Sequence, residues 1–170
     1  GVAEKAPESP VTPPAEDKPV EANPAEVKPA EAAAATAGEL DFHLAAAGKY
    51  AAKKRYRSAA AEYGAALGFL PGGDARGVRL NERQGAMMLR AGDEPKAGEY
   101  FLSAIKKAEE LKTSGKDLAD SHLGLGYCLE KAKKIPDAIS NYEKALELSG
   151  SKKIRARIAK TISDLKKPAK

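Results

Sequence analysis

The amino-acid sequence predicts an all-α fold built as an array of paired helices. One spacing of small and aromatic residues, Ala-x3-Tyr/Phe-x2-Ala, occurs three times, at Ala59–Ala66, Ala97–Ala104 and Ala138–Ala145. The three copies start 38 and 41 residues apart. Residues at i, i+4 and i+7 share one helix face, where small residues admit a neighbouring helix and the aromatic ring fills the space between them. Three copies at near-equal intervals indicate a repeat architecture.

Each copy follows another helical stretch that carries a small residue near its middle. These stretches contain, in chain order, Ala46-Ala47-x2-Tyr50, Gln84-Gly85-x2-Met88 and Leu123-Gly124-x2-Tyr127. The pattern of helix, turn and helix resembles the tetratricopeptide repeat family, whose unit has about 34 residues. The resemblance implies a right-handed α-α superhelix with units at 40–73, 78–111 and 117–152. It also implies two extra residues in the turn of the third unit, around Lys131 to Lys134.

Residues that start and stop helices divide the repeat region into six segments. Asp74 is an expected N-cap, and Pro95 and Pro136 stand in first turns, where the missing N–H of proline costs nothing. Gly115 and Ser149-Gly150 interrupt helices. The expected helices cover about 40–53, 57–70, 74–90, 95–112, 118–131 and 136–148.

A last helix at about 152–166 does not repeat the motif. Its apolar stripe at helical spacing consists of Ile154, Ile158, Ile162 and Leu165. A terminal repeat needs such a cover, because its open face would otherwise expose core residues. We therefore expect a capping helix. The alternative is a basic amphipathic helix for an anionic membrane surface, although the stretch has no large aromatic anchor.

The first 36 residues differ in composition from the rest of the chain. They hold seven of the eleven prolines, with alanine, glutamate, lysine and valine between them. Such a segment buries too little apolar surface to offset the entropy of ordering it, so we expect a disordered, extended linker followed by a tetratricopeptide domain at 37–170. In composition it resembles spacers of bacterial cell-envelope proteins. The alternative is a disordered tail with no spacer role.

Charge is distributed unevenly along the chain. Residues 1–39 contain three Lys and eight Asp or Glu, a net charge of −5, so residues 40–170 carry +10. Basic residues cluster at 53–57 and at 131–134, next to predicted turns. A shared basic edge would favour nucleic acid or an anionic surface. Only Tyr50 and Tyr56 accompany these clusters, so support for base stacking is weak and we do not expect nucleic acid as the partner.

The residues that carry catalysis or bind metals are few. His43 and His122 fall on helices of different units, whereas a metal site needs three or four clustered ligands. Cys128 is a lone cysteine that we interpret as a small buried apolar residue. The glycine pairs lack the context of a phosphate-binding loop. We expect no enzymatic activity, no cofactor and no metal site.

The family resemblance implies a concave groove lined by the first helix of each unit. A known clamp for C-terminal carboxylates uses Lys, Asn, Asn, Lys and Arg at positions that here hold other residues, so chaperone-tail binding is not expected. The groove suits an amphipathic helix or extended segment with apolar anchors and one acidic residue. The alternative is that Leu118, Leu125 and Leu129 pack against the last helix. The candidate groove residues are Leu44, Gly48, Ala52, Arg79, Glu82, Arg83, Ala86, Leu89, Arg90, Ser121, His122, Leu125 and Leu129.

These observations predict a protein–protein interaction module, an adaptor or assembly scaffold that binds a peptide or helix of a protein partner. Two alternatives are a secretion-type chaperone for exported subunits and a basic nucleic-acid or membrane-surface binder. Self-association through an unfilled groove is a further possibility. No apolar run is long enough to span a bilayer, so membrane attachment would need a segment outside this sequence. We favour a bacterial, envelope-associated location, with the cytoplasm as the alternative.

Overall fold

The computed structural model describes residues 29–167, which form α-helices joined by short turns. Residues 1–28, most of the expected linker, and 168–170 lie outside this range. The helices are α1 (Pro29–Ala52), α2 (Tyr56–Leu67), α3 (Arg76–Arg90), α4 (Glu94–Glu110), α5 (Lys116–Lys131), α6 (Ile135–Leu148) and α7 (Lys152–Leu165).

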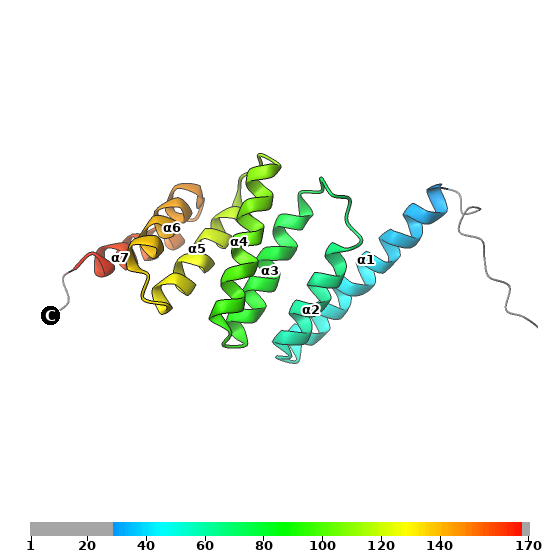
Figure 1. Cartoon of the computed structure of the whole chain (residues 1–170), viewed down its shortest axis with the longest axis horizontal. Helices are drawn as coiled ribbons and strands as arrows, with labels where there is room; N and C mark the ends of the chain where they lie inside the picture. The colour runs from blue at the N-terminus through cyan, green and yellow to red at the C-terminus, as the bar shows by residue number, and fades with distance from the viewer. Residues whose placement is uncertain (1–28, 168–170) are drawn as a thin grey trace, which may run out of the picture.

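The helices form consecutive antiparallel pairs that stand side by side in chain order (Figure 1). The pairs are α1 with α2, α3 with α4 and α5 with α6, and α3 also packs against α5 of the next pair. Turns within pairs all lie along one edge of the array, and connections between pairs lie along the opposite edge (Figure 1). The expected all-α repeat array is therefore confirmed.

The first helix begins earlier than the sequence analysis placed it. We expected a start near Leu40, but α1 begins at Pro29 and runs through Gly38 without interruption. Alanine is the strongest helix former, and residues 32–35 are all alanine, so the helix tolerates a single glycine. Residues 29–36, which we assigned to the linker, are helical.

The three turns within pairs have the same geometry. Lys54, Gly92 and Lys133 each adopt a positive φ, of 57°, 74° and 62°. In each turn the next residue's amide donates to a carbonyl five residues earlier, as Asp93 N does to Met88 O at 3.0 Å and Lys134 N to Leu129 O at 2.9 Å. This left-handed residue after the last helical turn is a standard helix stop. The third turn therefore contains no extra residues, and our alignment of the third unit is corrected by two positions.

Glycines at the helix crossings confirm the corrected register. A Cβ at Gly85 would lie 2.8 Å from the Phe101 ring, and a Cβ at Gly126 would lie 2.8 Å from the Tyr142 ring. Gly126, not Gly124, is thus the equivalent of Gly85. Gly124 has a different contact, because a Cβ there would lie 2.3 Å from Cζ of Phe101 in the preceding pair. The ring of Phe101 therefore occupies the space left by glycines of α3 and α5.

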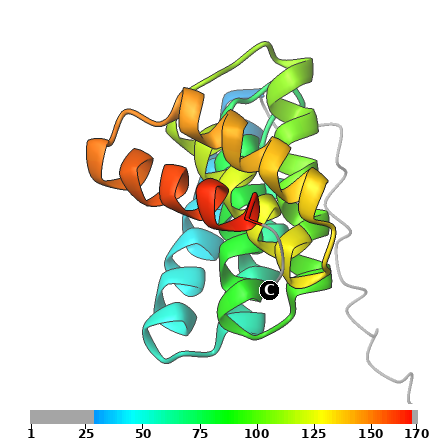
Figure 2. The ribbon, with the colours of Figure 1, turned by 90° about the vertical axis from the view of Figure 1, so that its left-hand side faces the viewer.

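The last helix covers the open face of α6. Ile158 and Ile162 are buried and cluster with Ala138, Tyr142 and Ala145. Ser151 caps α7, where its hydroxyl oxygen accepts a hydrogen bond from Ile154 N at 3.4 Å. Figure 2, viewed from the α7 end, shows α7 closing this end of the array.

Gly124→Ala is expected to lower the free energy of unfolding by about 1–3 kcal/mol, because the new methyl group overlaps the enclosed Phe101 ring. The matched control is Gly98→Ala on α4, where a Cβ meets its nearest atom, Cys128 Cβ, at 3.6 Å. This control is expected to be neutral or to stabilise by about 0.5–1 kcal/mol. Urea-induced unfolding followed by circular dichroism measures both. Equal effects would contradict the packing described here.

Ile158→Ala is expected to lower the free energy of unfolding by about 2–5 kcal/mol, because it removes a side chain that is 2% exposed in the α6–α7 interface. Ile154→Ala, on the same helix but only partly buried, is expected to cost less. The same unfolding measurement tests both variants. If the Ile158 variant unfolds like the wild type, α7 contributes nothing to closing the array.

Candidate functional site

A cavity of about 700 Å³ lies between α3, α5 and α7. It is open to solvent, and its floor is formed where Phe101 and Tyr142 reach between the helices. We call it the groove. Its lining residues are Glu82, Ala86, Leu89, Arg90, Phe101, Asp120, Leu123, Gly124, Tyr127, Glu130, Tyr142, Arg157, Ile158 and Thr161.

The α3 wall contains four of the residues proposed from the sequence. Glu82, Ala86, Leu89 and Arg90 all line the groove, because their spacing places them on one face of α3. Arg79 and Arg83, also proposed, lie beside this wall and take part in ion pairs instead of lining it.

The α5 wall consists of residues that the sequence analysis did not select. Ser121 and His122 are buried away from the groove, where the Ser121 hydroxyl donates to Asp117 O at 2.7 Å and His122 Nδ1 lies 2.9 Å from Asn141 Oδ1. Leu125 and Leu129 line a separate cleft. The residues facing the groove are instead Asp120, Leu123, Gly124, Tyr127 and Glu130.

The misplaced turn accounts for this difference. Counting from the third turn without extra residues moves each α5 position by two. Ser121, His122 and Leu125 move onto Leu123, Gly124 and Tyr127, which line the groove, whereas Leu129 moves onto Lys131, which does not. The signal was present in the sequence, because Gly126 precedes Lys133 by seven residues, as Gly85 precedes Gly92.

The residues proposed from the first unit are not brought to this cavity. Leu44 packs with the Leu40 cluster between α1 and α2, and Gly48 and Ala52 are exposed on α1. The structure thus places the candidate site in the second and third units and the last helix.

The second cleft lies between α4 and α5 and has a volume of about 550 Å³. Its apolar lining includes Leu102, Leu125, Cys128 and Leu129. Cys128 is buried, and burial raises the pKa of its thiol to about 11. A thiol with this pKa is not ionised at neutral pH, so Cys128 acts here as an apolar packing residue.

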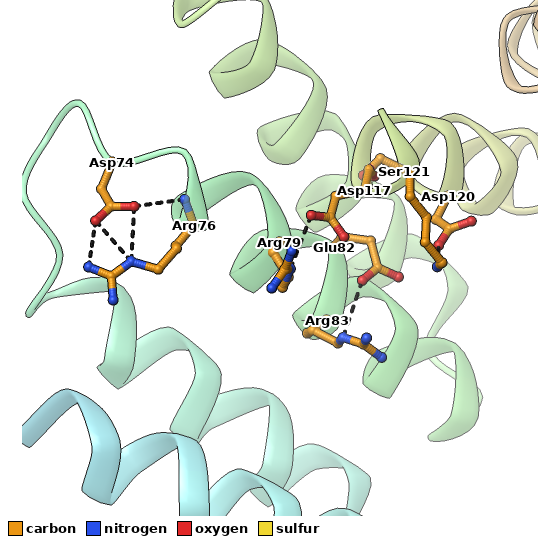
Figure 3. A network of polar contacts seen from close by, with 9 residues as sticks. Asp74, Arg76, Arg79, Glu82, Arg83, Asp117, Asp120 and Ser121 are labelled. Carbon is orange, nitrogen blue, oxygen red and sulfur yellow. Dashed lines mark hydrogen bonds and ion pairs between the residues drawn. The ribbon is translucent and has the colours of Figure 1, made fainter. Parts of the chain in front are cut away.

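One ion pair joins α3 to α5 beside the groove (Figure 3), and two others lie within these helices. Arg79 Nε donates to Asp117 Oδ2 at 3.1 Å, linking the two helices. Lys116 Nζ pairs with Asp120 within α5. Arg83 Nε lies 3.6 Å from Glu82 Oε2. Arg79 is thus already paired within the chain, and Arg83 has its neighbouring carboxylate.

Burial shifts the pKa values of three groups around the groove. Desolvation raises the pKa of Glu82, and the nearby Asp120 and Asp117 add to this, while Arg83 opposes it. Desolvation also lowers the pKa of His122. Tyr142 is buried, which raises its pKa, and its hydroxyl donates to Glu130 Oε2 at 2.7 Å. Glu82 and Tyr142 line the groove, together with Glu130, which accepts the hydrogen bond from Tyr142.

Arg90 and Arg157 stand on different walls of the groove. Neither forms an ion pair with an acidic residue within 29–167, although the Arg90 guanidinium lies 6.0 Å from the centre of the Tyr56 ring. The groove therefore combines apolar walls, three carboxylates and two cations available to a ligand.

Within residues 29–167, no group of three or more His, Cys, Asp or Glu side chains is arranged to hold a metal ion. None of the helices described has the length and apolar character required to cross a bilayer.

Comparisons with known proteins test the fold. No protein-family profile matches the sequence, and no curated protein matches it. Among solved structures, the Arabidopsis OM64 TPR domain superposes with a TM-score of 0.60 at 15% identity, over 76% of this chain and 98% of that domain. Together with the helix pairs, turns and crossings described above, this similarity shows that the chain folds as a tetratricopeptide-type repeat array.

Proposed function

We propose that this chain is a non-enzymatic adaptor or assembly scaffold that binds a helix or peptide of a protein partner in the groove. The tetratricopeptide fold supports a protein-interaction role in general terms. The observation that carries the proposal is the groove itself, a cavity of about 700 Å³ walled by three helices and containing an exposed aromatic residue, Tyr127. Ligand sites commonly have volumes of about 300–1,000 Å³.

The walls of the groove suit anchor side chains from one face of a helix. Ala86 and Leu89 on α3 and Leu123 and Tyr127 on α5 all line the cavity, so both walls present apolar side chains. A helix that binds in a groove presents its anchors at i, i+3, i+4 and i+7. An exposed aromatic beside a deep apolar floor is typical of the residues that dominate binding energy.

The basic turns offer a weaker site for nucleic acid or an anionic surface. Lys53–Arg55 and Lys131–Lys134 lie along the same edge of the array, as we expected (Figure 1). The turn between them is acidic, however, with Asp93 pairing with Arg57 at 2.8 Å and Glu94 beside it. The acidic turn therefore interrupts the positive charge along this edge. This favours the groove over the edge as the binding site.

The proposal also includes the expectations about a chaperone role, self-association and a spacer. The secretion-chaperone alternative would use the same groove, and self-association would place a second copy in it. The composition of residues 1–28 supports a spacer that holds the array away from an envelope anchor, and this part of the proposal rests on sequence alone.

Tyr127→Ala is expected to weaken binding of a peptide ligand at least tenfold, because it removes the largest exposed apolar side chain of the groove. The ligand is obtained by selecting random 16-residue peptides on a display library against the full chain. Fluorescence anisotropy with a labelled synthetic copy then gives the dissociation constant.

Leu102→Ala is the matched control, since Leu102 is 42% exposed and Tyr127 is 39% exposed, but Leu102 lies on α4 outside the groove. We expect it to change affinity less than twofold. Selected peptides that lose affinity with Leu102→Ala and keep it with Tyr127→Ala would place the binding surface in the cleft between α4 and α5.

A further inference from the structure

We infer that the groove recognises a lysine or arginine side chain of its partner, with Glu82 as the carboxylate that receives it. This inference rests on the proposed function and specifies the chemistry of one partner side chain that binds in the groove. It differs from the expectation of an acidic partner residue that the sequence alone supported.

The Glu82 carboxylate is nearly enclosed and has no hydrogen-bond donor within residues 29–167. The residue is only 8% exposed. Among the described residues its ion-pair partner is Arg83, whose Nε lies 3.6 Å from Oε2, too far for a hydrogen bond. The described residues contain no fully buried side-chain oxygen without a partner, so the Glu82 oxygens keep a small exposure to solvent. Glu82 is also one of the residues that line the groove.

A carboxylate in this position is costly to the free protein. Removing a charge from water without a hydrogen-bonded partner is unfavourable, and Arg83 compensates little because its side chain is half exposed to water. Two nearby cations are already paired with other carboxylates, Arg79 with Asp117 (Figure 3) and Lys116 with Asp120. A cation supplied by a partner would satisfy the carboxylate.

The surroundings of Glu82 fit a cationic side chain along its whole length. Ala86, Leu89 and Leu123 line the same cavity and would cover the aliphatic stem of a lysine or arginine. Asp120 and Glu130 are two further carboxylates that line the same cavity.

The groove also contains two cations of its own. The available arginines, Arg90 and Arg157, line the groove from α3 and α7. Acidic partner residues would therefore flank the central cation instead of replacing it.

The inference predicts a pH dependence with a defined sign. The charged groups that influence Glu82 are Arg83 and Lys116, which favour its ionised form, and Asp120 and Asp117, which oppose it. Because the pKa of Glu82 is raised, lowering the pH protonates it earlier than an ordinary glutamate. Affinity for a cationic peptide should therefore fall as the pH drops through that raised pKa, and Glu82→Gln should remove this dependence.

Glu82→Gln should fold normally. A glutamate whose pKa is raised on folding destabilises the native state increasingly as the pH rises above its unfolded pKa, so the neutral amide should keep or increase the melting temperature at pH 7. Glu147→Gln, at an exposed position of α6, is the matched control for the loss of one negative charge.

The experiment repeats the peptide selection on wild type, Glu82→Gln and Glu147→Gln. We expect wild type and Glu147→Gln to enrich Lys or Arg at one fixed position beside apolar residues, and Glu82→Gln to lose this enrichment. For the synthetic consensus peptide, replacing that residue with Gln should weaken binding to wild type at least tenfold and to Glu82→Gln less than threefold. The difference identifies the pair, since a general loss of stability would weaken both peptides equally.

Enrichment of Asp or Glu at the fixed position, or equal losses on both proteins, would overturn the inference while the groove proposal survives. Peptides whose binding is unchanged by Tyr127→Ala would instead overturn the groove proposal. The two failures are therefore distinguishable.

Discussion

The contact of aromatic rings with glycines is the constraint on which the rest of the structure depends. Phe101 projects from α4 into the space left by Gly85 of its own pair and Gly124 of the next, and it is 2% exposed. This contact fixes the distance between α3 and α5, and therefore the width of the groove whose floor the same ring forms. Tyr142 packs in the same way against Gly126, and it also clusters with Ile158 and Ile162 of α7. The contacts that pack these helices therefore also shape the groove.

The spacing of small and aromatic residues predicted the fold because the motif lies within single helices, where residues four and seven apart must share a face. The same reasoning placed the α3 wall of the groove. It misplaced the α5 wall because it matched Gly124 instead of Gly126 to Gly85. The conformation of Lys133 and the contact of Gly126 with the Tyr142 ring both identify Gly126 as the equivalent residue. The sequence analysis also missed that α7 lines the groove. The family resemblance assigns groove positions only within repeat units, and α7 lies outside them. The helix α1 starts early, at Pro29, because its many alanines favour helix more than Gly38 disfavours it.

The electrostatic properties of the groove depend on which charged side chains form ion pairs within the chain. Arg79 and Lys116 are paired with Asp117 and Asp120, whereas the buried Glu82 receives no hydrogen bond from any residue within 29–167. Sequence reasoning counted Arg79 and Arg83 as charges available to a partner, because pairing between neighbouring helices depends on the register of α3 and α5. The net positive charge of the domain consequently does not describe the groove, which gathers three carboxylates and two arginines.

The most direct test of this account is the amide spectrum of the full chain, recorded with and without the selected peptide at low and at high salt. Binding in the groove predicts shifts that cluster on the facing residues of α3, α5 and α7, including the amides of Glu82, Leu123 and Tyr127, and that persist at high salt. Shifts confined to the basic turns at 53–57 and 131–134, lost as salt is added, would contradict it.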